Sequence, residues 1–166
     1  MKPELSRPFS LDRLGSAGAV EVPVESNAEE RAALASRFGV PAIGALRCRF
    51  VLRPVPGGSV AAEGELRARV TQVCVVSLDP FEAEIVERFA VRFVPEGLES
   101  EDEDPESVDE IPFANATIDL GEAAAEQLAL ALEPYPRKPG AVLPQFSEEP
   151  GGPFGALAHF RRPGGT

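Results

Sequence analysis

The clearest pattern in the chain is an alternation of apolar and polar side chains over two neighbouring segments. Residues 45–53 and 66–70 each carry an apolar residue at every second position. This period of two predicts β-strands with one buried face. The proline- and glycine-rich residues 54–59 between them predict the reversal of a hairpin. The positions expected to point inward are Leu46, Cys48, Phe50, Leu52, Leu66, Ala68 and Val70.

The outward positions of this hairpin carry arginines. The inward residues of both segments have even numbers. Two residues that face each other across the hairpin must therefore have numbers that sum to an even value. In any such register all five arginines lie on one face. A sum of 116, for example, would place Arg47 opposite Arg69. Like charges across a ladder are unfavourable, so we expect an anion over them. The candidate binding face is Arg47, Arg49, Arg53, Arg67 and Arg69.

Two sources of that anion are open at this point. Glutamates of the sheet (Glu63, Glu65 or Glu82) or the acidic run could neutralise the arginines, or water could screen them. Alternatively, the face binds an external phosphate or an acidic partner surface. No aromatic residue lies at its outward positions, so base stacking is not expected there.

A further strand is expected after the hairpin. Residues 73–76 are apolar at every position, which is typical of a central strand covered on both sides. Residues 77–80 predict a turn, and alternation then returns over residues 81–93. Glu87 falls on the apolar side of that segment, which predicts a β-bulge rather than a buried carboxylate.

Two helices and two edge segments complete the expected elements. Asn27 with Glu30 predicts a capping box, and the helix it starts should end at Gly39. Asp119 is a good N-cap for a helix over 119–132, which is apolar nearly all round and should be buried. Residues 5–14 and 19–25 read as edge strands or flanking segments because each contains a proline. The short helix should bury Ala33, Leu34 and Phe38.

Together these elements predict an α+β fold. We expect a curled antiparallel sheet, barrel-like if it closes, with a buried C-terminal helix and a short N-terminal helix. Residues 1–140 would form one domain, interrupted by an acidic disordered loop at about 96–115. Residues 141–166 would form a proline- and glycine-rich tail. Its short apolar segment could dock on a partner through Phe154, Leu157 and Phe160.

Charge is strongly segregated along the chain. The net charge is −11, and residues 95–126 hold twelve acidic residues and no lysine or arginine. An acidic protein binds nucleic acid poorly by bulk electrostatics. The acidic run lacks the spacing and glycine of a calcium loop, so solvated carboxylates are expected.

The inventory of reactive residues argues against an enzyme. Two cysteines, Cys48 and Cys74, fall at apolar positions, and His159 is the single histidine. These are too few for a structural zinc site or a cysteine–histidine pair, and no phosphate loop or nucleophile elbow occurs. No cofactor or metal is expected. The chain has no apolar stretch near the ~18 residues of a membrane span and no leader-like start, so we expect it in the cytoplasm.

Several segments resemble one family. The strand–turn–strand of residues 70–93, the Ile-Asp-Leu-Gly start of the helix at Ile118, and the terminal Pro-Phe-Gly-Ala-Leu at Pro153 are similar to YceD proteins, the large ribosomal RNA subunit accumulation proteins. The family often carries Cys-x-x-Cys, whereas this chain has Cys74 followed by Ser77. The resemblance implies a non-enzymatic factor for 23S rRNA accumulation, associated with ribosomal protein L32.

Three functions are therefore weighed. The first is an assembly factor that binds large-subunit rRNA or a ribosomal protein, with the arginine face and the acidic loop as contact surfaces. The second is a general interaction module for a basic partner. The third is an RNA-processing enzyme, which the residue inventory favours least.

Overall fold

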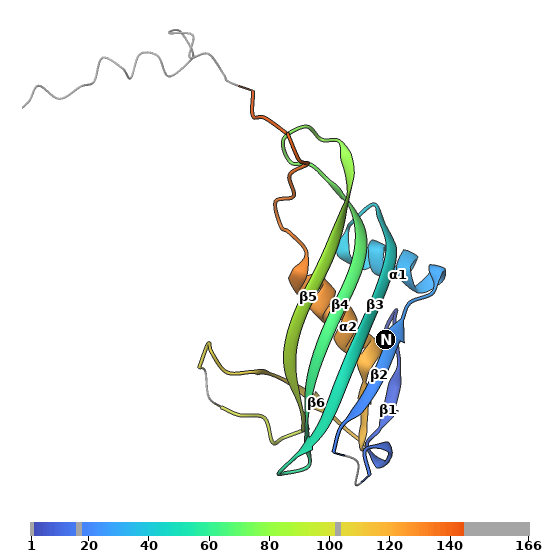
Figure 1. Cartoon of the computed structure of the whole chain (residues 1–166), viewed down its shortest axis with the longest axis vertical. Helices are drawn as coiled ribbons and strands as arrows, with labels where there is room; N and C mark the ends of the chain where they lie inside the picture. Colours follow the sequence, from blue (N-terminus) through green and yellow to red (C-terminus); the bar gives the residue numbers. More distant parts are fainter. Residues whose placement is uncertain (1, 16–17, 102–103, 145–166) are drawn as a thin grey trace, which may run out of the picture.

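The computed structural model describes residues 2–15, 18–101 and 104–144. Over these ranges the chain forms a five-stranded sheet of order β2-β3-β4-β5-β6, a two-stranded sheet of β1 and β7, and two α-helices (Figure 1). The elements are β1 Pro8–Ser10, a 3-10 turn Leu11–Arg13, β2 Val20–Glu25, α1 Ala28–Phe38, β3 Ala42–Val55, β4 Ser59–Val73, β5 Pro80–Pro95, β6 Asp109–Phe113, β7 Thr117–Asp119 and α2 Leu120–Ala131.

The predicted α+β class is confirmed, but the sheet does not close into a barrel. Strands β2 to β5 are antiparallel, whereas β6 runs parallel to β5. The two border strands, β2 and β6, do not pair with each other. Both are short, and β2 carries Pro23, which cannot donate to a further ladder.

Strands β3 and β4 form the predicted hairpin. Their inward residues are buried, and from Ala45 to Val55 the paired residue numbers sum to an even value, as expected. This sum is 114, as in Leu46 facing Ala68 and Arg47 facing Arg67. A single pair of arginines therefore lies directly across the ladder. A register shift between Ile43 and Ala45 makes the sum odd where Ile43 faces Val70.

Two local predictions about the strands are wrong. Val73–Val76 is not a central strand: β4 ends at Val73, and residues 74–79 form the turn into β5. Val75 is 47% exposed there, so an apolar run does not mark a strand covered on both sides at this point. There is also no bulge at Glu87, which faces Leu66 in an unbroken register. Its side chain is exposed because the inner side of β5 is not covered at that point.

Strand β6 corrects the prediction of a disordered loop at about 96–115. Asp109–Phe113 pairs with Val91–Pro95 of β5. The sequence pattern does not reveal this strand because it carries two acidic residues and a proline. Its backbone hydrogen bonds come from parallel pairing with the longer strand β5. An alternating pattern of apolar and polar residues does not indicate that two strands pair in this way.

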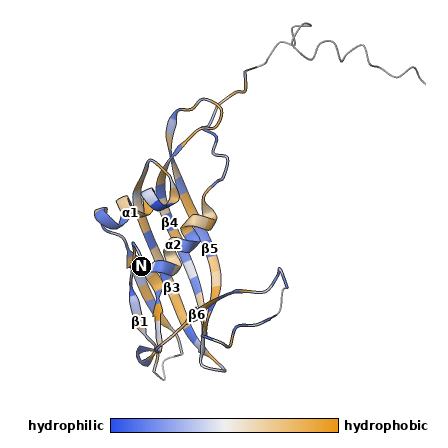
Figure 2. Cartoon of the chain, turned by 180° about the vertical axis from the view of Figure 1, so that it is seen from behind, coloured by the Kyte–Doolittle hydropathy of each residue, from blue (hydrophilic) through white to orange (hydrophobic). Residues whose placement is uncertain are grey.

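Helix α2 covers the inner face of the sheet. Ala123, Ala124, Ala125 and Leu128 are buried in the same core as the inward residues of β3 and β4. Small side chains let the helix approach the strands closely. Figure 2, seen from behind, shows α1 and α2 together on this side of the sheet. The outer side is left without a helix in the described chain.

Helix α1 begins and ends as its sequence predicts. Asn27 and Glu30 form both bonds of the capping box, and Gly39 ends the helix with a φ of 66°. Leu34 is buried as expected. Ala33 is exposed and Ala35 is buried in its place, because β3 lies against a slightly different face of the helix.

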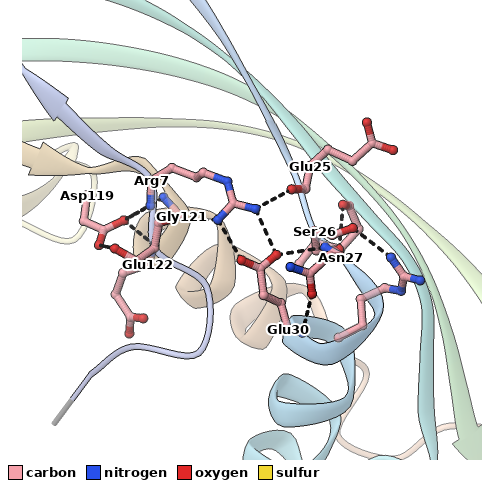
Figure 3. Close-up of polar contacts among 11 residues, drawn as sticks. Arg7, Glu25, Ser26, Asn27, Glu30, Asp119, Gly121 and Glu122 are labelled. Carbon is pink, nitrogen blue, oxygen red and sulfur yellow. Dashed lines mark hydrogen bonds and ion pairs between the residues drawn. The ribbon is translucent and has the colours of Figure 1, made fainter.

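The N-terminal segment ties α2 to α1. The Asp119 carboxylate caps α2 by accepting from Gly121 N and Glu122 N, and it also accepts from Arg7 N at 2.8 Å and Ser6 Oγ at 2.6 Å (Figure 3). The Arg7 guanidinium, in turn, holds both carboxylate oxygens of Glu30 at 2.7 and 2.9 Å. This ion pair lowers the pKa of Glu30, chiefly through the hydrogen bond from Arg7.

Gly121 is required by this close approach. A Cβ at Gly121 would lie 2.8 Å from both Arg7 N and Leu5 O. Those atoms belong to the backbone of a segment that the buried side chains of Leu5 and Phe9 anchor in the core, so they cannot move aside at low cost.

We therefore predict that Gly121→Ala destabilises the protein by about 1–3 kcal/mol in urea unfolding, as overpacking does. Helix propensity alone would favour alanine by about 1 kcal/mol, so a net destabilisation reports the steric clash with the backbone. Gly18→Ala is the control, since nothing lies within 4 Å of its Cβ position. A neutral or stabilising Gly121→Ala would contradict the prediction.

In the described chain, neither helix is both long and apolar enough to cross a membrane.

Candidate functional site

The five predicted arginines lie on the outer face of the sheet. They alternate with the buried residues of β3 and β4, so they emerge on the side opposite the two helices. Figure 1 shows these strands at the centre of the sheet. The outer face is defined here by the outward side chains of β2 to β5.

Four of the five arginines have glutamate partners on this face. The distances run from 2.8 to 3.6 Å between guanidinium nitrogen and carboxylate oxygen. The pairs are Arg49–Glu21, Arg53–Glu63, Arg67–Glu65 and Arg69–Glu82. The glutamates expected from the sequence therefore supply most of the neutralising charge, with Glu21 added from β2.

Sequence reasoning misses Glu21 because its strand is distant along the chain. Residues 19–25 read as extended, but nothing in the pattern specifies that β2 pairs with β3. The pairing sets Glu21 opposite Val51 and Glu25 opposite Arg47. Long-range pairing of this kind is decided by the tertiary structure.

Arg47 differs from the other four. Among the described residues its guanidinium makes no ion pair, although it stands between Glu25 on β2 and Arg67 on β4. Surface hollows of about 250 and 180 Å³ lie on its two sides. Residues lining both hollows are Arg47 and Arg67.

This arrangement suits an anion. Two guanidiniums facing each other across a ladder repel unless negative charge lies between or above them. Guanidinium binds phosphate and carboxylate through paired donors. The neighbouring ion pairs are exposed and worth only about 0–1 kcal/mol each, so an incoming anion can displace them. No aromatic side chain lies on the outer face of β3 or β4.

Comparison with known proteins gives a family match over a segment that begins within β4 and continues past the end of α2. Residues 62–153 match the family model described as Large ribosomal RNA subunit accumulation protein YceD. The chain belongs to the YceD family. A search of curated proteins and a search of solved structures each found no match.

Only some of the five arginines of the outer face lie within the residues that match the YceD family model. Arg67 and Arg69 lie within it, whereas Arg47, Arg49 and Arg53 lie before its first residue. The family's description connects the protein with the accumulation of large-subunit ribosomal RNA. This description names a cellular outcome and gives neither a binding site nor a reaction. The residues that act must therefore be sought on the surface of the chain.

Cys74 and Ser77 lie in a tight turn. Ser77 N donates to Cys74 Sγ at 3.4 Å, and Cys74 N donates to Asp79 O at 2.9 Å. Hydrogen bonds from the Ser77 side chain and backbone, and from Lys138 N, lower the pKa of the Cys74 thiol to about 7. Burial raises the pKa of Cys48 to about 12.

These thiols have no metal-site companions in the described part of the chain, which contains no group of three or more His, Cys, Asp and Glu residues able to hold an ion. Ser77 supplies a donor where a second thiolate would be needed. The turn is therefore organised by hydrogen bonds to sulfur.

The predicted docking residues of the tail, Phe154, Leu157 and Phe160, lie outside the described residues. Their role stays a prediction.

We predict that thiolate absorbance of the protein rises with a midpoint near pH 7, set by the pKa of about 7 at Cys74. Cys74→Ala should remove this step, Ser77→Ala should move it to higher pH, and Cys48→Ala should leave it unchanged. Because the folded pKa lies below that of the unfolded thiol, the associated stability is complete above the unfolded pKa and is lost as pH falls through about 7. A titration unaffected by Ser77→Ala would contradict the assigned cause.

Proposed function

We propose that this YceD protein supports the accumulation of large-subunit rRNA as a non-catalytic binding factor in the cytoplasm. The outer face around Arg47 is its contact surface for rRNA phosphate or for an acidic group of a ribosomal protein. The observation that supports this most directly is an arginine without an ion pair among the described residues, facing a second arginine between two hollows.

The charge of the face favours selective over general binding. Glutamates alternate with the arginines, and the protein carries a net charge of −11. Non-specific attraction to RNA is therefore weak. Binding then depends on a few phosphates placed to meet Arg47 and Arg67, and it should fall steeply with salt.

A second candidate is an interaction module for a basic protein. The segment between β5 and β6 exposes Glu99, Glu101, Asp104 and Glu106. Exposed carboxylates attract cationic ribosomal proteins, such as the L32 implied by the resemblance. Deleting residues 99–106 should release such a partner in a pulldown, without reducing binding to an rRNA fragment.

The test of the first proposal is charge reversal at Arg47. Arg47→Glu should weaken binding of large-subunit rRNA, or of the co-purifying ribosomal protein, by roughly tenfold or more, because one attraction becomes a repulsion. With RNA, the slope of log affinity against log salt should also fall by about one for each phosphate that is no longer neutralised. Arg137→Glu is the matched control, since Arg137 is exposed and lies after α2, away from the outer face.

Equal weakening by both variants would show that net charge alone decides binding. No effect of Arg47→Glu on either partner would exclude the outer face as the contact surface.

A further inference from the structure

Strand β5 has a long free edge. It spans Pro80–Pro95 and pairs with β4 along almost all of its length, whereas β6 reaches only Val91–Pro95. Figure 1 shows β5 at the border of the sheet, with β6 beside one end. From Phe81 to Ala90, no backbone hydrogen bond from the described residues reaches the side away from β4.

This edge lacks several of the features that protect a border strand. Proteins guard edges with prolines, bulges, charged side chains, inward-pointing charges or covering elements, because every second residue directs its N–H and C=O outward. Of these features the edge carries charged side chains, including Glu87 on the inner side. Residues 81–90 contain no proline or lysine, and their register is unbroken. By contrast, the opposite border strand β2 is six residues long and carries Pro23.

The side chains along the edge combine apolar and acidic groups. On the outer side Val86 is 57% exposed, and on the inner side Ile85 and Phe89 are only partly buried against the core. Glu84 points to the outer side and Glu87 to the inner side. Neither makes an ion pair within the described ranges, while Glu82 and Arg88 are engaged by Arg69 and Glu65.

We infer that an extended basic segment of a partner protein adds to this edge as a sixth strand of the sheet. Its backbone would complete the ladder, its apolar residues would cover Val86 and Ile85, and its lysines or arginines would meet Glu84 and Glu87. Main-chain bonds give such strand addition its affinity, and alternate side chains give it specificity.

The charges select a basic segment over a second copy of this chain. In an antiparallel pair of β5 strands that keeps inner faces together, the inner side contributes Phe81, Ala83, Ile85, Glu87 and Phe89 from each copy. That side holds no cation, so both Glu87 carboxylates would be covered without a partner. Two chains of charge −11 also repel each other.

The free edge adjoins the face around Arg47, because Glu84, Ile85 and Val86 line one of the two hollows beside Arg47. The two proposals can still fail separately, because strand addition uses the backbone of β5 and anion binding uses the guanidinium of Arg47. Arg47 lies on β3, and β4 separates β3 from β5.

The experiment is residue-resolved amide hydrogen exchange of the full chain, with and without a labelled peptide in which pairs of lysines alternate with pairs of valines, so that each face of the added strand carries both residue types. In the free protein we expect alternate amides of residues 81–90 to exchange fast. The peptide should protect those amides, and a copy of it with N-methylated backbone should not bind. Arg47→Glu should not weaken peptide binding, because it replaces a cation near Glu84 by a carboxylate.

Charge reversal provides the matched control. Glu84→Lys with Glu87→Lys should weaken peptide binding about tenfold, because two attractions become repulsions. Glu21→Lys with Glu25→Lys changes the net charge equally on the other border strand and should have less than about a twofold effect.

Four results would overturn the inference. Equal weakening by both double variants would show bulk attraction, and protection outside residues 81–90 would place the peptide elsewhere. Slow exchange of all edge amides in the free chain, independent of concentration, would show that the chain covers its own edge. Slow exchange that appears only at high concentration, together with a dimer in sedimentation, would make a second copy the occupant.

Discussion

Burial of one face of the sheet under α2 is the constraint on which the rest of the structure depends. Strands β3 and β4 place large apolar residues such as Phe50 and Leu66 inward, and the alanines of α2 allow the helix to lie close over them. A shift of one residue would move this apolar set to solvent, so the register is strongly specified. The same constraint carries every arginine of the hairpin to the opposite side.

The position of the arginines on the outer face therefore follows from the packing of the core. Their charge environment depends on which strands this packing places beside β3 and β4. Glutamates from β2, β4 and β5 neutralise most of the arginines. Arg47 is left between Glu25 and Arg67 without an ion pair in the described chain. A protein with a net charge of −11 thus keeps one arginine of this face without a neutralising glutamate among the described residues.

The N-terminal segment fixes the helix that closes the core. Asp119 joins the cap of α2 to the backbone of Arg7, and Gly121 leaves room for that backbone to pass close to the helix. The Arg7–Glu30 pair then links the segment to the cap of α1. Two helices far apart in sequence are positioned by one short strand and a few charge-assisted hydrogen bonds.

The sequence by itself determined the α+β class, both helix caps, the hairpin and the shared face of the five arginines, because these follow from local propensity and a period of two. It could not determine which even register sum the hairpin adopts, the partner of β2 or the strand at Asp109–Phe113. Only the tertiary structure decided those, since each depends on which distant strand supplies backbone hydrogen bonds. The free edge of β5 belongs to the same class, because it exists only where β6 stops.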